Sequence, residues 1–88
     1  MSAQNIIPTV NPLLRRPVVS QLTGYPRSTL YRRAKKGLFT NPVQIGGDRV
    51  AWPANEIEAL NRARIAGKSD DEIKKLVIDL HRARNATA

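Results

Sequence analysis

The stretch from Pro17 to Lys36 most constrains the fold, because it predicts two short helices separated by a tight turn. Pro17 suits the first turn of a helix, where its missing N–H would have no intrahelical partner. Gly24 ends that helix, since glycine accepts the left-handed backbone that closes helices. Pro26 tolerates the first turn of the next helix but not its interior, so the second helix starts near Pro26 or Arg27. A turn this short lets two helices cross steeply, as in a helix-turn-helix.

The second helix has an apolar face and a cationic face. At 100° per residue, Leu30 and Ala34 point inward. The opposite face carries no acid, whereas a merely solvated helix mixes charges because oppositely charged pairs four apart stabilise it. We therefore predict that this helix binds a polyanion and enters the major groove of DNA. Its candidate DNA-binding residues are Arg27, Ser28, Thr29, Tyr31, Arg32, Arg33, Lys35 and Lys36.

The net charge of +8 is concentrated in the first half of the chain. Residues 1–52 contain eight Arg or Lys against Asp48 alone, a net charge of +7, while residues 53–88 contain seven bases and six acids. This asymmetry places the polyanion-binding surface in the first half. Arg15 and Arg16, just before the first helix, are candidate phosphate contacts.

A β-hairpin is predicted after the second helix. Residues 42–45 and 49–52 alternate apolar and polar side chains around Gly46-Gly47-Asp48, which suits a tight turn. We expect four of its side chains to face the core or line its edge: Val43, Ile45, Val50 and Trp52. A hairpin in this position is the wing of a winged helix-turn-helix, with Gly46, Gly47 and Arg49 as candidate contacts to the DNA backbone or minor groove. The alternative is a hairpin that only closes the core.

Two further helices are predicted in the second half. Pro53 opens a helix with an acid, Glu56, in its first turn, where the helix dipole favours negative charge. Ser69 and Glu72 match a capping box, so a fourth helix runs from about Asp70 to Arg84. Its apolar stripe consists of Ile73, Leu76, Val77 and Leu80, with Ile78 outside it. This helix either folds back on the core, which we favour, or mates with a second copy.

A chain of 88 residues has room for one small core. We predict a mainly α fold with a small β-hairpin, divided into a mobile N-terminal arm (1–12), a winged helix-turn-helix (13–66) and a C-terminal helical extension (67–88). The absence of cysteine excludes disulfides and thiolate metal sites, and we therefore expect the protein in a reducing cytoplasm. No apolar run approaches the length of a membrane span, and no signal peptide is evident.

The residue types for catalysis are missing from the pattern. The sequence shows no paired-carboxylate cleft, no nucleophile with a base, no phosphate-cradling glycine loop and no metal-ligand spacing, so we expect no enzyme activity, cofactor or metal. His81 has no acidic or histidine neighbour at ligand spacing and is assigned no such role. RNA binding is disfavoured, because the four aromatic residues form no evident stacking platform.

The segment Arg27-Ser28-Thr29-Leu30-Tyr31-Arg32, followed by Gly46-Gly47 and Trp52, resembles the AlpA family of phage and prophage regulators. These are small MerR-like winged helix-turn-helix proteins related to excisionases, and the resemblance covers residues 14 to about 77. It implies a cytoplasmic, nucleoid-associated DNA-binding regulator of a phage, prophage or integrative element. The family usually has serine where this chain has Pro26, so the side-chain cap of the second helix is lost.

The resemblance leaves several functions open. The first is a sequence-specific transcriptional regulator, and the second is an excisionase that bends DNA to assist an integrase. A third is a protein-binding inhibitor acting through the fourth helix. One copy reads few base pairs, so we expect paired or repeated occupancy, through self-association by the C-terminal helix or on DNA. The sequence specifies neither the operator nor the sign of regulation.

Overall fold

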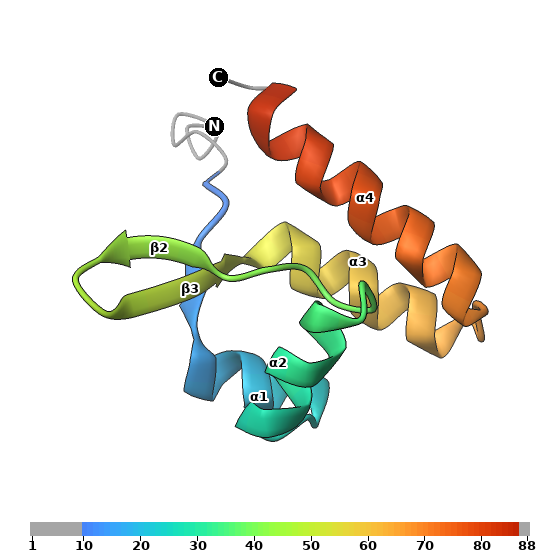
Figure 1. The fold of residues 1–88 in the computed structure, drawn as a ribbon, viewed down its shortest axis with the longest axis horizontal. Helices are drawn as coiled ribbons and strands as arrows, with labels where there is room; N and C mark the ends of the chain where they lie inside the picture. Colours follow the sequence, from blue (N-terminus) through green and yellow to red (C-terminus); the bar gives the residue numbers. More distant parts are fainter. Residues whose placement is uncertain (1–9, 87–88) are drawn as a thin grey trace, which may run out of the picture.

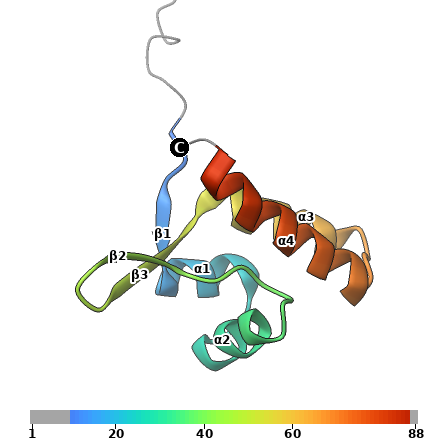
Figure 2. The same ribbon diagram turned by 45° about the horizontal axis from the view of Figure 1, so that its top comes forward.

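The computed structural model describes residues 10–86 and has four helices and one small antiparallel sheet (Figure 1). Its elements in chain order are β1 (Leu13–Arg15), α1 (Arg16–Thr23), α2 (Arg27–Lys35), β2 (Val43–Gly46), β3 (Arg49–Pro53), α3 (Ala54–Ile65) and α4 (Asp70–Ala86). The predicted fold class, mainly α with a small hairpin, is confirmed. The hairpin formed by β2 and β3 projects from the body, away from α3 and α4 (Figures 1 and 2).

The helix-turn-helix has the predicted boundaries. Gly24 ends α1 in the left-handed conformation, with φ 78°, and its N–H donates to the Ser20 carbonyl at 2.9 Å. Val19 of α1 and Leu30 of α2 are both fully buried and belong to the same core. The two helices are therefore fixed to each other by apolar packing on either side of a turn that only glycine adopts without strain.

The sheet contains one strand more than the predicted hairpin. Its order is β1-β3-β2, and Leu14 of β1 lies opposite Trp52 of β3. The sequence indicated only a short extended piece around Leu14, because three residues are too few to show alternation. Trp52 is fully buried, and its indole Nε1–H donates to the Thr40 carbonyl at 2.8 Å.

The prediction that Ile45 faces the core or lines its edge is wrong. Its side chain is 39% exposed, whereas Trp52 is buried and Val50 packs against the core. The register of β2 and β3 shifts between Gln44 and Gly46, and this part of the hairpin extends beyond the body (Figure 1). Alternation can predict the side of a strand but not how far the core reaches along it.

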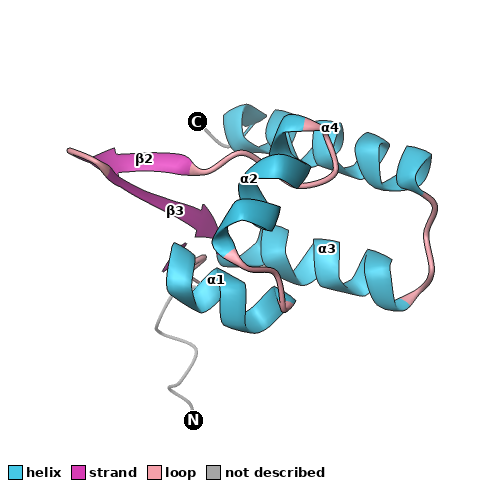
Figure 3. Cartoon of the chain, turned by 60° about the horizontal axis from the view of Figure 1, so that its bottom comes forward, coloured by secondary structure: helices cyan, strands magenta, loops and turns pink. Residues whose placement is uncertain are grey.

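Helix α4 folds back on the core, as favoured from the sequence, and runs alongside α3 (Figure 3). Ile73 and Val77 are buried in the common core, while Ile78 is 51% exposed. The capping box is present: the Glu72 N–H donates to Ser69 Oγ at 3.2 Å, and the Ser69 N–H donates to Glu72 Oε1 at 2.9 Å. The Ser69 backbone amide lowers the pKa of Glu72, and the Ser69 hydroxyl and the charge of Lys68 lower it further.

Glu56 lies in the first turn of α3, as predicted, but it also has a distant partner that the sequence did not indicate. It is only 2% exposed and forms an ion pair with Arg84 of α4, with 2.6 Å between Arg84 Nε and Glu56 Oε2. The local helix dipole favours an acid at this position but does not specify an ion-pair partner. The partner lies 28 positions away, so the pairing arises from the packing of α4 on α3.

Most of the predicted mobile arm, residues 1–9, lies outside the described residues. Asn11 is held to the start of α3, where it accepts from the Asn55 N–H at 2.9 Å and donates from Nδ2 to Asn55 Oδ1 at 2.6 Å. The Pro12 carbonyl accepts from the Ala54 N–H at 2.8 Å. Among residues 10–86, no helix has both the length and the apolar character that a bilayer crossing requires.

Candidate nucleic-acid interface

Helix α2 presents a cationic face to solvent and an apolar face to the core. Leu30 is fully buried and Ala34 packs against the core, as predicted. Five of the eight candidate residues are exposed: Arg27, Ser28, Arg32, Lys35 and Lys36. The other three are partly buried: Thr29, Tyr31 and Arg33. The helix therefore has one side on which cations reach solvent and two flanks on which candidate residues also contact the protein.

Local contacts orient the side chains at the start of α2. The guanidinium of Arg27 lies over the Tyr31 ring, 5.8 Å from its centroid, and the Tyr31 ring is 6.1 Å from that of the buried Trp52. Arg32 Nη2 lies 3.4 Å from Thr29 Oγ1, within range of a weak hydrogen bond. These contacts limit the conformations of Arg27 and Arg32 without burying either charge.

Arg33 is more deeply engaged with the protein than the other cations of α2. Its guanidinium lies 5.1 Å from the centroid of the Tyr25 ring, and its Nε is buried without a hydrogen-bond partner in the described residues. Tyr25 in turn packs edge-on against Phe39 of the core. Arg33 thus contributes to the packing between the helix-turn-helix turn and α2, and its role in DNA contact stays a prediction.

Pro26 occupies the N-cap position of α2, in the extended conformation expected of a cap residue. Its carbonyl accepts from the N–H groups of Thr29 and Leu30, both at 3.0 Å. No side chain among the described residues caps the helix, as expected with proline at this position. The start of α2 is therefore held by backbone hydrogen bonds and by packing of Leu30.

The candidate wing residues lie at the tip of the hairpin. Gly46 and Gly47 have φ of 130° and 55°, values that side chains with a Cβ rarely adopt. Gln44 Nε2 donates to the Gly47 carbonyl and closes the turn. Arg49 is exposed on β3 beside this turn. The predicted phosphate contacts lie elsewhere, at the junction of β1 and α1, where Arg15 is exposed and Arg16 is partly buried.

None of the candidate cations pairs with an acidic side chain in the described part of the chain. Among residues 10–86 there are two salt bridges, Arg62–Glu58 on α3 and Arg84–Glu56 between α4 and α3. Both pairs lie in the second half of the chain, so the positive charge of α1, α2 and the wing is not neutralised within the described protein. An uncompensated cationic surface on a helix-turn-helix is the electrostatic footprint of a nucleic-acid-binding protein.

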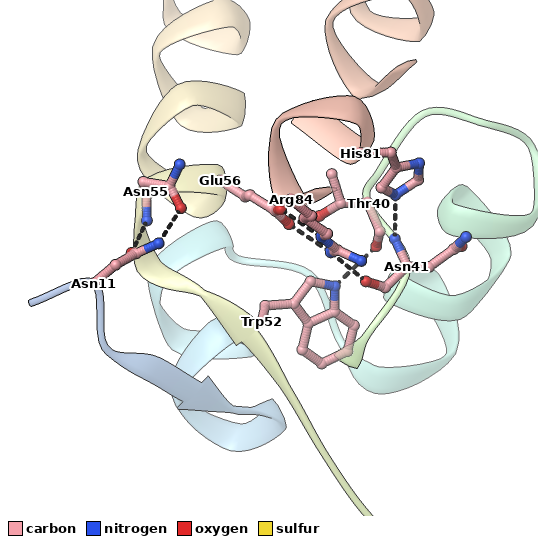
Figure 4. A network of polar contacts seen from close by, with 8 residues as sticks. All are labelled: Asn11, Thr40, Asn41, Trp52, Asn55, Glu56, His81 and Arg84. Atoms are coloured by element: carbon pink, nitrogen blue, oxygen red, sulfur yellow. Dashed lines mark hydrogen bonds and ion pairs between the residues drawn. The ribbon is translucent and has the colours of Figure 1, made fainter. Parts of the chain in front are cut away.

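A polar network that the sequence did not indicate joins the segment after α2 to α4 and α3. Asn41, just before β2, contacts His81 and Arg84 of α4 through its backbone, and Arg84 continues to Glu56 (Figure 4). The only sequence signal was the placement of opposite charges on two neighbouring predicted helices, which does not specify a pair. No group of three or more His, Cys, Asp or Glu side chains among residues 10–86 could hold a metal ion.

Comparison with known proteins identifies relatives of phage origin. The family model described as prophage CP4-57 regulatory protein (AlpA) matches residues 12–65, which include α1, α2, the hairpin and α3. An uncharacterized protein, ORF88, of Enterobacteria phage P4 is 46% identical over 55 residues. The matched region is 62% of this chain and 62% of that relative, so the chain spans less than two thirds of the relative's length. No solved structure matches the chain.

Proposed function

The chain belongs to the AlpA family of phage-associated DNA-binding regulators, and on that premise we propose that it is a sequence-specific, double-stranded DNA-binding transcriptional regulator. Helix α2 enters the major groove and the hairpin contacts the backbone or minor groove beside it. The family consists of regulators rather than enzymes, and the proposal requires no cofactor or metal. We place the protein in the cytoplasm, on the DNA of a phage, prophage or integrative element.

One observation carries this proposal: the exposed face of α2, opposite the buried Leu30, carries several cations without acidic partners among the described residues and no acid. Arg32 lies at the centre of this face. Arginine can donate two hydrogen bonds to guanine O6 and N7, which discriminates bases, while Lys35 and Lys36 neutralise phosphates. Ser28 and Thr29, near the start of the helix, are placed to donate to phosphate oxygens.

The experiment is binding of Arg32→Ala to DNA from the region upstream of the gene, after footprinting with the wild type. We expect a loss of about 1–3 kcal/mol of binding free energy and relaxed preference at one base position. The matched control is Arg62→Ala, which removes an exposed arginine of α3 that pairs with Glu58. Equal affinity and preference for Arg32→Ala and the wild type would remove Arg32 from the interface.

A second candidate function is that of an excisionase. The exposed cationic part of one copy is a helix of nine residues and one hairpin tip, which covers few base pairs, so several copies must bind side by side. Such an array can bend DNA and assist an integrase. Clustered direct repeats with protein-induced bending would favour this function, whereas a single operator overlapping a promoter would favour transcriptional control.

A protein-binding function through α4 gives a different result in the same experiment. Binding to a protein partner would survive removal of DNA and would depend on Ile78, which is 51% exposed, rather than on Arg32. Self-association through α4 would depend on the same exposed face. Measuring the Ile78→Ala variant together with Arg32→Ala therefore separates a protein interface from a DNA interface.

A further inference from the structure

The segment between α2 and β2, residues 36–42, connects the two parts of the proposed DNA interface, and we call it the connector. It contains no helix or strand, yet Leu38, Phe39 and Thr40 are buried. The Thr40 carbonyl accepts from the indole of Trp52. The position of the hairpin relative to α2 depends on how this segment is held, because the connector is the direct covalent link between them.

Helix α4 holds the connector by both polar groups of the Asn41 backbone (Figure 4). The Asn41 N–H donates to His81 Nε2 at 3.0 Å, and the Asn41 carbonyl accepts from Arg84 Nη2 at 2.7 Å. His81 must be neutral to accept this bond. Burial and the charge of Arg84 lower the pKa of His81, against an opposing effect of Glu56, so the accepting form is favoured at neutral pH.

Arg84 is itself fixed from the other side by Glu56. Two hydrogen bonds join them, from Nε to Oε2 at 2.6 Å and from Nη2 to Oε1 at 2.7 Å. This bidentate arrangement fixes the plane of the guanidinium as well as its position. Because Glu56 is 2% exposed and stands at the start of α3, the connector is tied through Arg84 to the rigid body of the protein.

We propose that Arg84 and His81 are positioning residues for DNA binding, which hold the connector so that α2 and the hairpin reach DNA together. Both lie on α4, beyond residues 12–65 that the family model matches. Neither residue touches DNA in this proposal. Arg84 and His81 would instead pre-organise the hairpin before DNA binds. A hairpin that becomes ordered only on binding reduces affinity, because binding then includes the loss of its conformational freedom. The inference rests on the proposed DNA-binding function and on the wing contact of Arg49.

A double-mutant cycle between Arg84 and Arg49 tests the proposal. We expect Arg84→Gln to weaken DNA binding about five- to tenfold, as for the loss of one contact with the strength of an ordinary hydrogen bond. It should also reduce the salt slope by about one unit, which is the change expected for Arg49→Ala, because both variants would remove the same phosphate contact. In the Arg49→Ala background, Arg84→Gln should weaken binding less than about twofold. Fluorescence anisotropy at several salt concentrations measures all four proteins.

Two further variants separate positioning from charge and from global unfolding. Arg82→Gln makes the same charge change at an exposed neighbour on α4 and should bind within about twofold of the wild type. His81→Phe removes the acceptor for Asn41 but leaves the Arg84–Glu56 pair, and should weaken binding in the same cycle with Arg49→Ala. Circular dichroism gives the temperature at which each variant begins to unfold, and binding is measured below that temperature.

Each outcome supports the proposal or overturns it. If Arg84→Gln or His81→Phe weakens DNA binding less in the Arg49→Ala background than in the wild type, positioning through the connector is supported. Strictly additive losses, or folded Arg84→Gln and His81→Phe proteins with wild-type affinity and salt slope, overturn it. If Arg84→Gln does not fold, His81→Phe decides. Failure of the DNA-binding function would be seen separately, as a wild type that shows no binding or an Arg32→Ala variant that binds like the wild type.

Discussion

Helices α2 and α4 differ in how their charges relate to their own stability. Helix α4 starts with Asp70, Asp71 and Glu72 and ends with Arg84 in its last turn, which matches the helix dipole at both ends. Helix α2 has no acid in its first turn and begins instead with Arg27, where the dipole disfavours a cation. It also lacks the side-chain cap that Ser69 provides for α4.

The difference separates charges that are paired within the fold from charges that are free to meet a partner. In α4 the acidic start, the capping box and the Arg84–Glu56 pair all stabilise the folded chain. In α2, Arg32 and Lys35 lie in the last turn, where the helix dipole favours cations, but Arg27 at the start is opposed by it. None of the exposed cations of α2 forms a salt bridge within residues 10–86, so their charge is available to the polyanion of the proposed function. The tertiary structure adds that the two helices are not independent, because α4 contacts the connector that follows α2.

The largest expected effect tests whether α4 belongs to the same cooperative core as α2. Ile73 is 1% exposed, so Ile73→Ala should destabilise the protein by about 2–4 kcal/mol, similar to Leu30→Ala in α2. Denaturant unfolding followed by circular dichroism measures both variants. The control is Ile78→Ala, on the exposed side of α4, with an expected change below about 0.5 kcal/mol. If Ile73→Ala were as stable as the wild type, α4 would not belong to the cooperatively folding core.

The next largest effect on stability is expected from substitutions at the N-cap positions of α4 and α2. Ser69→Ala removes the cap of α4 and should destabilise the protein by about 1 kcal/mol. Pro26→Ser restores a cap to α2, but the gain is offset by about 0.4–1 kcal/mol, because serine gives the unfolded chain more freedom than proline. We therefore expect a smaller net change for Pro26→Ser, measured by thermal unfolding. If Pro26→Ser lost more than about 1 kcal/mol of stability, the Pro26 ring would be required for the start of α2. The control is Ser28→Ala, which should leave stability almost unchanged.

The smallest effect concerns the pH dependence of the contact between α4 and the connector. The folded-state pKa of His81 is lowered, so its contribution to stability is present above the unfolded-state pKa of about 6.5 and is lost as pH falls through the folded-state value. At neutral pH, His81→Phe should lose about 0.5 kcal/mol, the lower end of the range for one hydrogen bond, because the bond to Asn41 is exposed. The difference from the wild type should narrow on acidification, and a constant difference from pH 7.5 to pH 5 would contradict the contact.

The helix-turn-helix could be read from local signals. Gly24 and Pro26 determine where one helix ends and the next begins, and the spacing of Leu30 and Ala34 determines which side of α2 faces inward. Gly46 and Gly47 determine the position of the hairpin turn, and Ser69 the start of α4. Each signal depends on the backbone preference of one residue or on the period of a helix, and these hold whatever the rest of the chain does.

Three features depended on residues that are distant in the sequence. The pairing of β1 with β3, the exposure of Ile45 and the burial of Glu56 against Arg84 all follow from how far the core extends and what packs on it. The sequence by itself determined the elements, their faces and the segregation of charge, because these are properties of short segments. Only the tertiary structure decided that α4 holds the connector behind the cationic surface, because that contact exists only once α3 and α4 are packed together.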